Sequence, residues 1–179
     1  MTQTYGPTAL ATPANALSVV RLLAAPVLVV VLVMDHRSWL LIGAWVVLSS
    51  TDWVDGWVAR RQGATRSGAF LDPLADKVAV LGAFGGLVAL GTLPLLPVVV
   101  IAVREVAMSV YRSVAGTRGR SIPARPLAKI KTWVQDVVIL LALLPGAAGA
   151  AVAPSLGPLV WAAAAITVVT GVQYAMDRR

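Results

Sequence analysis

The chain has 179 residues, of which 58% are hydrophobic and only 13% are charged, whereas an ordinary soluble domain has roughly 25% charged residues. This composition excludes most soluble folds, because a soluble domain of this size needs a larger polar surface. The sequence has no cysteine and a single histidine, His36, which excludes disulfides and thiolate metal sites. Any bound metal must therefore be a hard ion held by oxygen, such as magnesium or manganese.

The formal net charge of +7 is compatible with nucleic-acid binding, but the distribution of the basic residues argues against it. They form short clusters between apolar runs, which is typical of a membrane protein that faces anionic lipid. Residues 1–14 form a short polar segment before the first apolar run. We therefore expect membrane lipids, and no nucleic acid, as partners.

Six apolar stretches approach the roughly 20 residues that a helix needs to cross a bilayer. They cover about 17–34, 39–50 (which runs into a polar motif at Thr51), 70–91, 94–115, 127–145 and 156–176. A lipid-exposed backbone must satisfy its own hydrogen bonds, so these stretches are expected to be helices. The sequence predicts an all-α, polytopic membrane protein with six transmembrane helices in one domain, residues 1–179.

The basic residues also predict the orientation of these helices. One set of connections and the C-terminal tail hold Arg60, Arg61, Arg66, Arg118, Arg120, Arg125, Lys129, Arg178 and Arg179. The opposite connections, at 35–38, 91–94 and 146–155, hold one basic residue, Arg37. By the positive-inside rule both termini are cytoplasmic. Arg21, near the start of the first span, is expected to extend toward the cytoplasmic interface.

Four of the eight acidic residues fall within 25 residues, at the edges of predicted membrane helices. They are Asp52, Asp55, Asp72 and Asp76. Their spacings of three and four residues place each pair on one helix face, and an antiparallel hairpin would bring the two pairs together. Such a group of carboxylates repels itself unless a divalent cation lies among them. The alternative is that each aspartate pairs with an arginine, such as Arg60 or Arg104.

The residues around these aspartates resemble a known family signature. Residues 52–60 read D-W-V-D-G-W-V-A-R and residues 68–76 read G-A-F-L-D-P-L-A-D. Together they resemble the CDP-alcohol phosphatidyltransferase signature, D-x2-D-G-x2-A-R followed by G-x3-D-x3-D. One departure is that seven residues separate Arg60 from Gly68, where the family usually has eight or more. We expect a shortened turn there.

The resemblance implies six membrane helices, an active site open to the cytoplasm of a bacterial cell with the enzyme in the inner membrane, and a homodimer. It implies that Asp52, Asp55, Asp72 and Asp76 bind two divalent metals, Mg²⁺ or Mn²⁺, and that Asp76 is the general base. The donor would be CDP-diacylglycerol. Its cytidine diphosphate part would be held by the first two aspartates together with Gly56, Ala59, Arg60 and Gly68.

The acceptor must be inferred from residues outside the signature. Arg104, Glu105 and Arg112 share one polar arc of the fourth predicted helix, where charges are expected to face a hydrated cavity. With Lys129 and Lys131 they are suited to hold a phosphate, and Glu105 would orient an arginine. The alternatives are a structural ion pair between Glu105 and the arginines, and interfacial anchoring by the two lysines.

These residues resemble the phosphatidylglycerophosphate synthase branch of the family, whose acceptor is glycerol 3-phosphate. The resemblance rests on Arg104, Glu105, Arg112, the segment 129–135, and Asn15, Ser18, Arg21 and Pro26. Other acceptors stay open, namely phosphatidylglycerol, which would give cardiolipin, or an inositol phosphate. A divalent-cation transporter and a non-catalytic scaffold are more distant alternatives. Asp136 receives no assignment.

Overall fold

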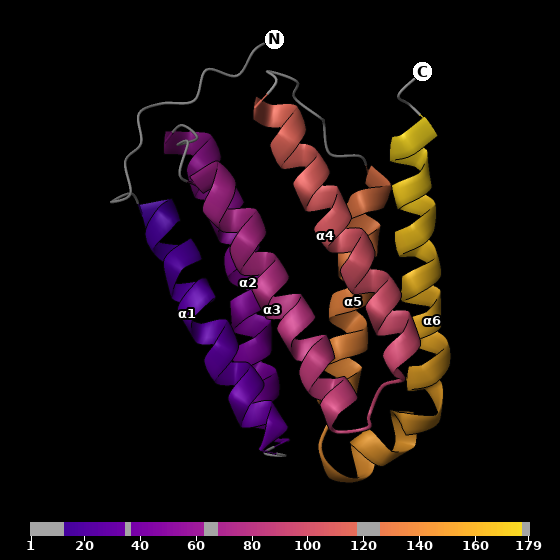
Figure 1. The fold of residues 1–179 in the computed structure, drawn as a ribbon. Coiled ribbons are helices and arrows are strands. Elements are labelled where there is room, and N and C mark those ends of the chain that lie inside the picture. Colours follow the sequence, from indigo (N-terminus) through magenta and orange to yellow (C-terminus); the bar gives the residue numbers. More distant parts are fainter. Residues whose placement is uncertain (1–12, 35–36, 63–67, 118–125, 177–179) are drawn as a thin grey trace. The chain divides into compact units, whose positions relative to one another are not determined.

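A computed structural model describes the backbone of residues 13–34, 37–62, 68–117 and 126–176, and within these the side chains of 16–34, 37–51, 74–111, 130–173 and 176. Six helices make up these ranges (Figure 1): α1 Pro13–Val33, α2 Trp39–Gln62, α3 Gly68–Ala89, α4 Leu95–Thr117, α5 Pro126–Ala142 and α6 Gly146–Met176. The described backbone contains no strand, so the all-α prediction is confirmed.

Each helix overlaps one of the six predicted apolar stretches, but two bounds differ: α2 continues through the polar motif to Gln62, and α6 begins earlier than predicted. The connection predicted at 146–155 is wrong, because α6 already begins at Gly146. Those ten residues are rich in alanine, the strongest helix former, and the segment therefore continues the helix despite Pro154 and Pro158. Prolines bend helices, and Figure 1 shows the first turns of α6 at an angle to the rest.

The chain divides into two compact units, Met1–Gly86 and Leu87–Arg179. In the first unit α1 and α2 run antiparallel and pack along each other (Figure 1). The third helix approaches α1 closely at Gly82 and Gly86: a Cβ at Gly82 would lie 3.0 Å from Val29 Cγ2, and one at Gly86 would lie 3.2 Å from Leu32 Cδ2. Glycines four residues apart thus form the small-residue contact that membrane helices use.

The second unit contains α4, α5 and α6, with α6 packed against both other helices. Its core includes Ile101 of α4, Ile139 of α5 and Val160 of α6, none of which is exposed. A tight turn leads into α4: Gly91, with a φ of 67°, donates to Val88, and Thr92 donates to Leu87. This is the helix-ending arrangement in which glycine adopts the left-handed conformation.

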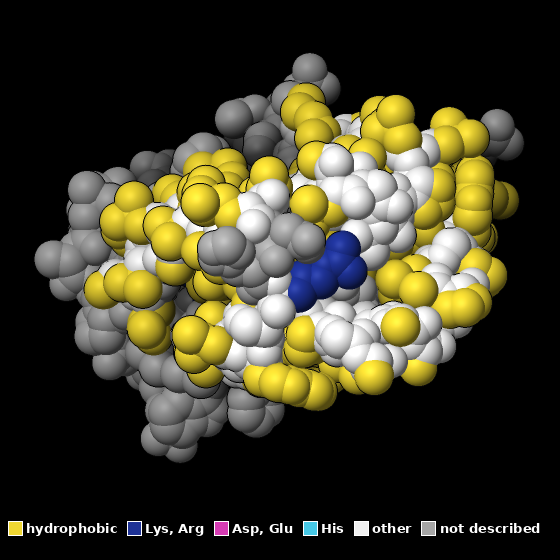
Figure 2. All heavy atoms as spheres, turned by 90° about the horizontal axis from the view of Figure 1, so that it is seen from below, with side chains coloured by type: hydrophobic (Ala, Val, Ile, Leu, Met, Phe, Trp, Pro, Cys, Tyr) yellow, Lys and Arg dark blue, Asp and Glu magenta, His cyan; other side chains and the backbone are white. Residues whose placement is uncertain are grey.

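The described surface is apolar, whereas the interior contains polar groups. Leu40 is 83% exposed and Trp133 is 71% exposed, but Ser18, Thr167 and Thr170 are buried. Figure 2, a view from below relative to Figure 1, shows patches of hydrophobic side chains between white atoms, and basic side chains in one small patch. Two described helices contain segments long and apolar enough to cross a bilayer, Ala16–Val33 and Gly146–Gln173. An apolar exterior around polar side chains is the arrangement of a membrane protein.

The contact between α1 and α3 generates a stability prediction. Replacement of Gly82 by valine places atoms against Val29, and overpacking of this kind typically costs about 1–3 kcal/mol. Gly85 is the matched control, because a Cβ there would have no neighbour within 4 Å. We expect Gly82→Val to lower the unfolding midpoint in detergent relative to Gly85→Val. Equal midpoints for the two variants would show that the close approach contributes nothing to stability.

Candidate functional site

The two predicted aspartate pairs lie on consecutive helices of the first unit. Asp52 and Asp55 belong to the second half of α2, and Asp72 and Asp76 to the beginning of α3. Asp55 precedes the end of α2 by seven residues and Asp72 follows the start of α3 by four, about 10 Å and 6 Å along the respective axes. The helical backbone confirms that each pair occupies a single helix face.

Only one of these four carboxylates belongs to a side chain that the structure describes. Asp76 is half-buried on α3. The side chains of Asp52, Asp55 and Asp72, and those of Ala59 and Arg60, lie outside the described residues, so the convergence of the carboxylates stays a prediction. Gly56 lies within α2, and Gly68 is the first residue of α3. The helix therefore resumes at the signature glycine despite the shortened spacing.

Arg21 does not extend to an interface as predicted. Its side chain is buried at 2% exposure, and its Nε donates to Thr51 Oγ1 at 3.2 Å. The Thr51 hydroxyl itself donates to the carbonyl oxygen of Leu48 at 2.6 Å. A polar partner inside the α1–α2 contact is available, so the guanidinium stays between the helices. It thereby connects α1 to the turn of α2 immediately before Asp52.

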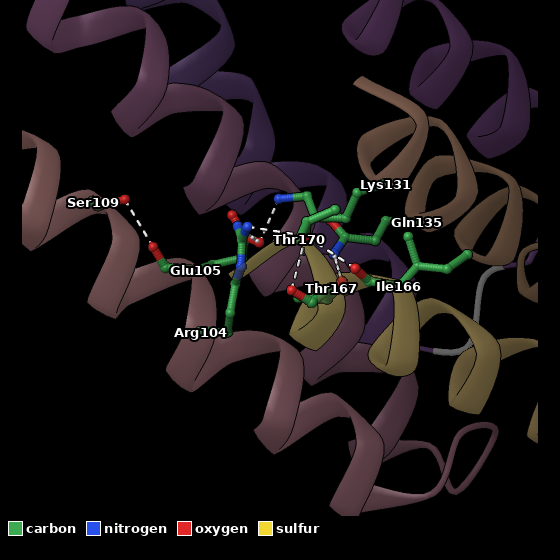
Figure 3. A network of polar contacts seen from close by, with 8 residues as sticks. All are labelled: Arg104, Glu105, Ser109, Lys131, Gln135, Ile166, Thr167 and Thr170. Atoms are coloured by element: carbon green, nitrogen blue, oxygen red, sulfur yellow. Dashed lines mark hydrogen bonds and ion pairs between the residues drawn. The ribbon is translucent and has the colours of Figure 1, made fainter. Parts of the chain in front are cut away.

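A buried network of charged groups occupies the second unit (Figure 3). Glu105 Oε1 accepts from Arg104 Nη1 at 3.0 Å and from Lys131 Nζ. These side chains are between 8% and 12% exposed. The ion pair of Arg104 with Glu105, which was the alternative to a phosphate site, is present, and the interfacial anchoring considered for Lys131 is wrong because Lys131 is buried against Glu105. Binding of a phosphate by these residues stays a prediction. The side chains of Arg112 and Lys129 lie outside the described residues.

The last helix contributes polar residues that sequence reasoning missed. Arg104 Nη2 donates to Thr170 Oγ1 at 3.0 Å, and Gln135 Nε2 of α5 donates to Thr167 Oγ1 at 3.0 Å. Thr167, Thr170 and Gly171 are spaced three and one residues apart, so they lie on one side of α6. A polar or small stripe of this kind in an apolar helix is a signal that could have identified them.

The charge balance of this cluster suits an anion. Two cations share one carboxylate, so Arg104, Lys131 and Glu105 together carry one net positive charge. Arg104 Nε is buried and has no hydrogen-bond acceptor among the described residues. Buried donors are normally satisfied. A phosphate group would add negative charge and acceptor oxygens, and arginine is especially suited to bind such groups.

Removal of the shared carboxylate should destabilise the second unit. Glu105→Ala leaves the buried Lys131 and the largely buried Arg104 without their shared carboxylate, and loss of one partner of a buried ion pair costs about 3–5 kcal/mol. Ser109→Ala is the control on the same helix, because the Ser109 hydroxyl donates to the backbone carbonyl of Glu105. We expect Glu105→Ala alone to lower the unfolding midpoint in detergent strongly. A midpoint equal to that of Ser109→Ala would contradict the structural importance of the ion pairs.

Comparison with known proteins places this arrangement in a family. The profile for CDP-alcohol phosphatidyltransferase matches residues 11–173. The chain is 39% identical over 178 residues to a probable phosphatidylglycerophosphate synthase of Mycobacterium tuberculosis, covering 96% of this chain and 84% of that protein. It is 40% identical over 131 residues to the CDP-diacylglycerol–glycerol-3-phosphate 3-phosphatidyltransferase of Bacillus subtilis, covering 72% and 68%.

A relative from Rickettsia bellii with the same enzyme name is 31% identical over 166 residues, which cover 89% of this chain and 91% of that protein. The matched region includes both aspartate pairs and the buried cluster of α4, α5 and α6. The chain therefore belongs to the CDP-alcohol phosphatidyltransferase family.

Proposed function

We propose that this protein transfers the phosphatidyl group of CDP-diacylglycerol to glycerol 3-phosphate, forming phosphatidylglycerophosphate and CMP. The observation that carries the choice of acceptor is the buried contact of Arg104 and Lys131 with Glu105. It supplies the positively charged donors that a phosphate-bearing acceptor requires. Relatives named for this reaction, among them the Bacillus subtilis protein, support the same choice. The reaction is a step of phospholipid biosynthesis.

The donor side of the proposed site consists of the aspartates on α2 and α3. Asp52, Asp55, Asp72 and Asp76 would hold two magnesium or manganese ions. The aspartate side chains fit these ions, because magnesium and manganese prefer carboxylate oxygen. The chain has no cysteine and only one histidine as competing ligands. The bound ions would neutralise the negative charge of the diphosphate. Beside the first two aspartates, Gly56, Ala59, Arg60 and Gly68 would hold the cytidine diphosphate part.

The chemical step is a displacement at the phosphorus that bears the lipid. The acceptor hydroxyl oxygen bonds to that phosphorus, the bond from phosphorus to the CMP oxygen breaks, and CMP leaves with the electron pair. Asp76 takes the hydroxyl proton as general base. It is half-buried and lies one helical turn beyond Asp72 on α3. Arg104, Arg112, Lys129 and Lys131 hold the phosphate of the acceptor, and Glu105 orients Arg104.

We further propose that the six helices span a bacterial inner membrane, with both termini and the active site on the cytoplasmic side, and that the enzyme is a homodimer. The apolar exposed surface supports insertion. The concentration of basic residues in one set of connections supports the orientation. Lipid tails would then stay in the bilayer while the water-soluble acceptor and CMP exchange with the cytoplasm.

An acceptor screen tests this function. Purified protein in detergent, with CDP-diacylglycerol and magnesium or manganese, is offered glycerol 3-phosphate, inositol phosphate, serine and phosphatidylglycerol separately, and CMP release is measured. We expect release with glycerol 3-phosphate only, and loss of release when a chelator removes the divalent ion.

Two results would contradict the proposal in different ways. Release with phosphatidylglycerol or inositol phosphate in place of glycerol 3-phosphate would keep the transfer chemistry and overturn the acceptor. Undiminished CMP release after chelation of the divalent ions would overturn the role of the aspartates as metal ligands.

A further inference from the structure

The hydroxyl group of Thr170 is fixed by its own helix and accepts a hydrogen bond from Arg104. Thr170 Oγ1 lies 2.9 Å from the carbonyl oxygens of both Ile166 and Thr167, so its one proton is donated within α6. The oxygen accepts from Arg104 Nη2 at 3.0 Å, while Nη1 donates to Glu105 at 3.0 Å. Contacts with two helices therefore fix the plane of the guanidinium group (Figure 3).

The neighbouring residue, Gly171, provides the space in which the Arg104 side chain lies. A Cβ at Gly171 would be 3.2 Å from Arg104 Nε and 3.4 Å from Arg104 Cγ. Favourable contacts between such atoms are longer, about 3.5–4.0 Å. Any larger residue at this position would push the arginine away from α6. Thr170 and Gly171 together thus act as a platform for one side chain of α4.

A phosphate-binding arginine depends on orientation, because its donors form a rigid planar fork. We propose that Thr170 and Gly171 are positioning residues that hold Arg104 in the orientation that binds the acceptor phosphate. The last helix thereby contributes to selection of the acceptor. This inference rests on the proposed function, in which Arg104 contacts that phosphate. Neither α6 residue contacts the substrate in this account.

The alternative is that both residues only pack α6 against α4. The two accounts differ in the kinetic constant that changes. Loss of orientation weakens binding of one substrate and raises its KM with little change in kcat. Loss of packing lowers stability and affects both substrates alike. Gly171→Ala separates the two cases well, because alanine favours a helix more than glycine does.

The experiment measures KM for glycerol 3-phosphate and for CDP-diacylglycerol, kcat and the thermal midpoint. Thr170→Val removes the hydroxyl oxygen that accepts from Arg104 but keeps the shape of the side chain. Thr170→Ser retains that oxygen. We expect Thr170→Val to raise KM for glycerol 3-phosphate about tenfold, the scale of one lost hydrogen bond to a charged group. KM for CDP-diacylglycerol and kcat should stay unchanged, and Thr170→Ser should match the wild type.

Gly171→Ala is compared with Gly157→Ala on the same helix, where a Cβ would have no neighbour within 4 Å. We expect Gly171→Ala to raise KM for glycerol 3-phosphate severalfold without a lower thermal midpoint. Gly157→Ala should show neither change. Affinity for inorganic phosphate, measured by calorimetry on the same proteins, should fall in Thr170→Val and Gly171→Ala only.

The two proposals fail separately. Absence of CMP release by the wild type with glycerol 3-phosphate contradicts the function. The positioning role is contradicted if KM for glycerol 3-phosphate is unchanged in both Thr170→Val and Gly171→Ala. It is also contradicted if KM rises equally for both substrates. If the wild type uses another acceptor, the affinity for inorganic phosphate tests the positioning role instead. Equal phosphate affinity in the wild type, Thr170→Val and Gly171→Ala would overturn that role.

Discussion

The ion pairs of Glu105 are the interaction on which the interior of the second unit depends. Glu105 Oε1 accepts from both Arg104 and Lys131; Glu105 and Lys131 are buried, and the Arg104 side chain is 12% exposed. Charges removed from water are tolerated only when they are paired and hydrogen-bonded. This requirement limits the residues that can surround them. Threonine hydroxyls and a glutamine amide line the neighbouring positions of α5 and α6, and Gly171 leaves room for the arginine.

The same constraint is compatible with the anion-binding role that we propose for the cluster. Arg104, Lys131 and Glu105 together retain one positive charge. Contacts with residues of α4 and α6 hold the guanidinium group of Arg104 rigidly. Preorganised donors bind an incoming anion without having to reorganise first. The apolar exterior of the helices complements this interior, because a bilayer accepts the exposed valine and leucine side chains while the charges remain inside.

The sequence predicted the helices well because each is a long apolar run with a polar break on either side. It failed at 146–155, where glycine and alanine suggested a loop but form the bent beginning of α6. The association of Arg104 with Glu105 was predictable because the two oppositely charged residues are consecutive in one apolar helix, where each needs a partner. The contacts of Arg21 with Thr51 and of Arg104 with Thr170 were not predicted, because in each an arginine meets an uncharged residue of another helix, and only tertiary packing brings the two together.

The central claim is that the buried cluster of Arg104, Glu105 and Lys131 binds the acceptor phosphate. It is tested most directly by replacing Lys131 with methionine, which removes the charge and keeps the length of the side chain, followed by measurement of KM for each substrate. The account predicts that KM for glycerol 3-phosphate rises at least about tenfold while KM for CDP-diacylglycerol is unchanged. An unchanged KM for glycerol 3-phosphate in a stably folded variant would contradict it.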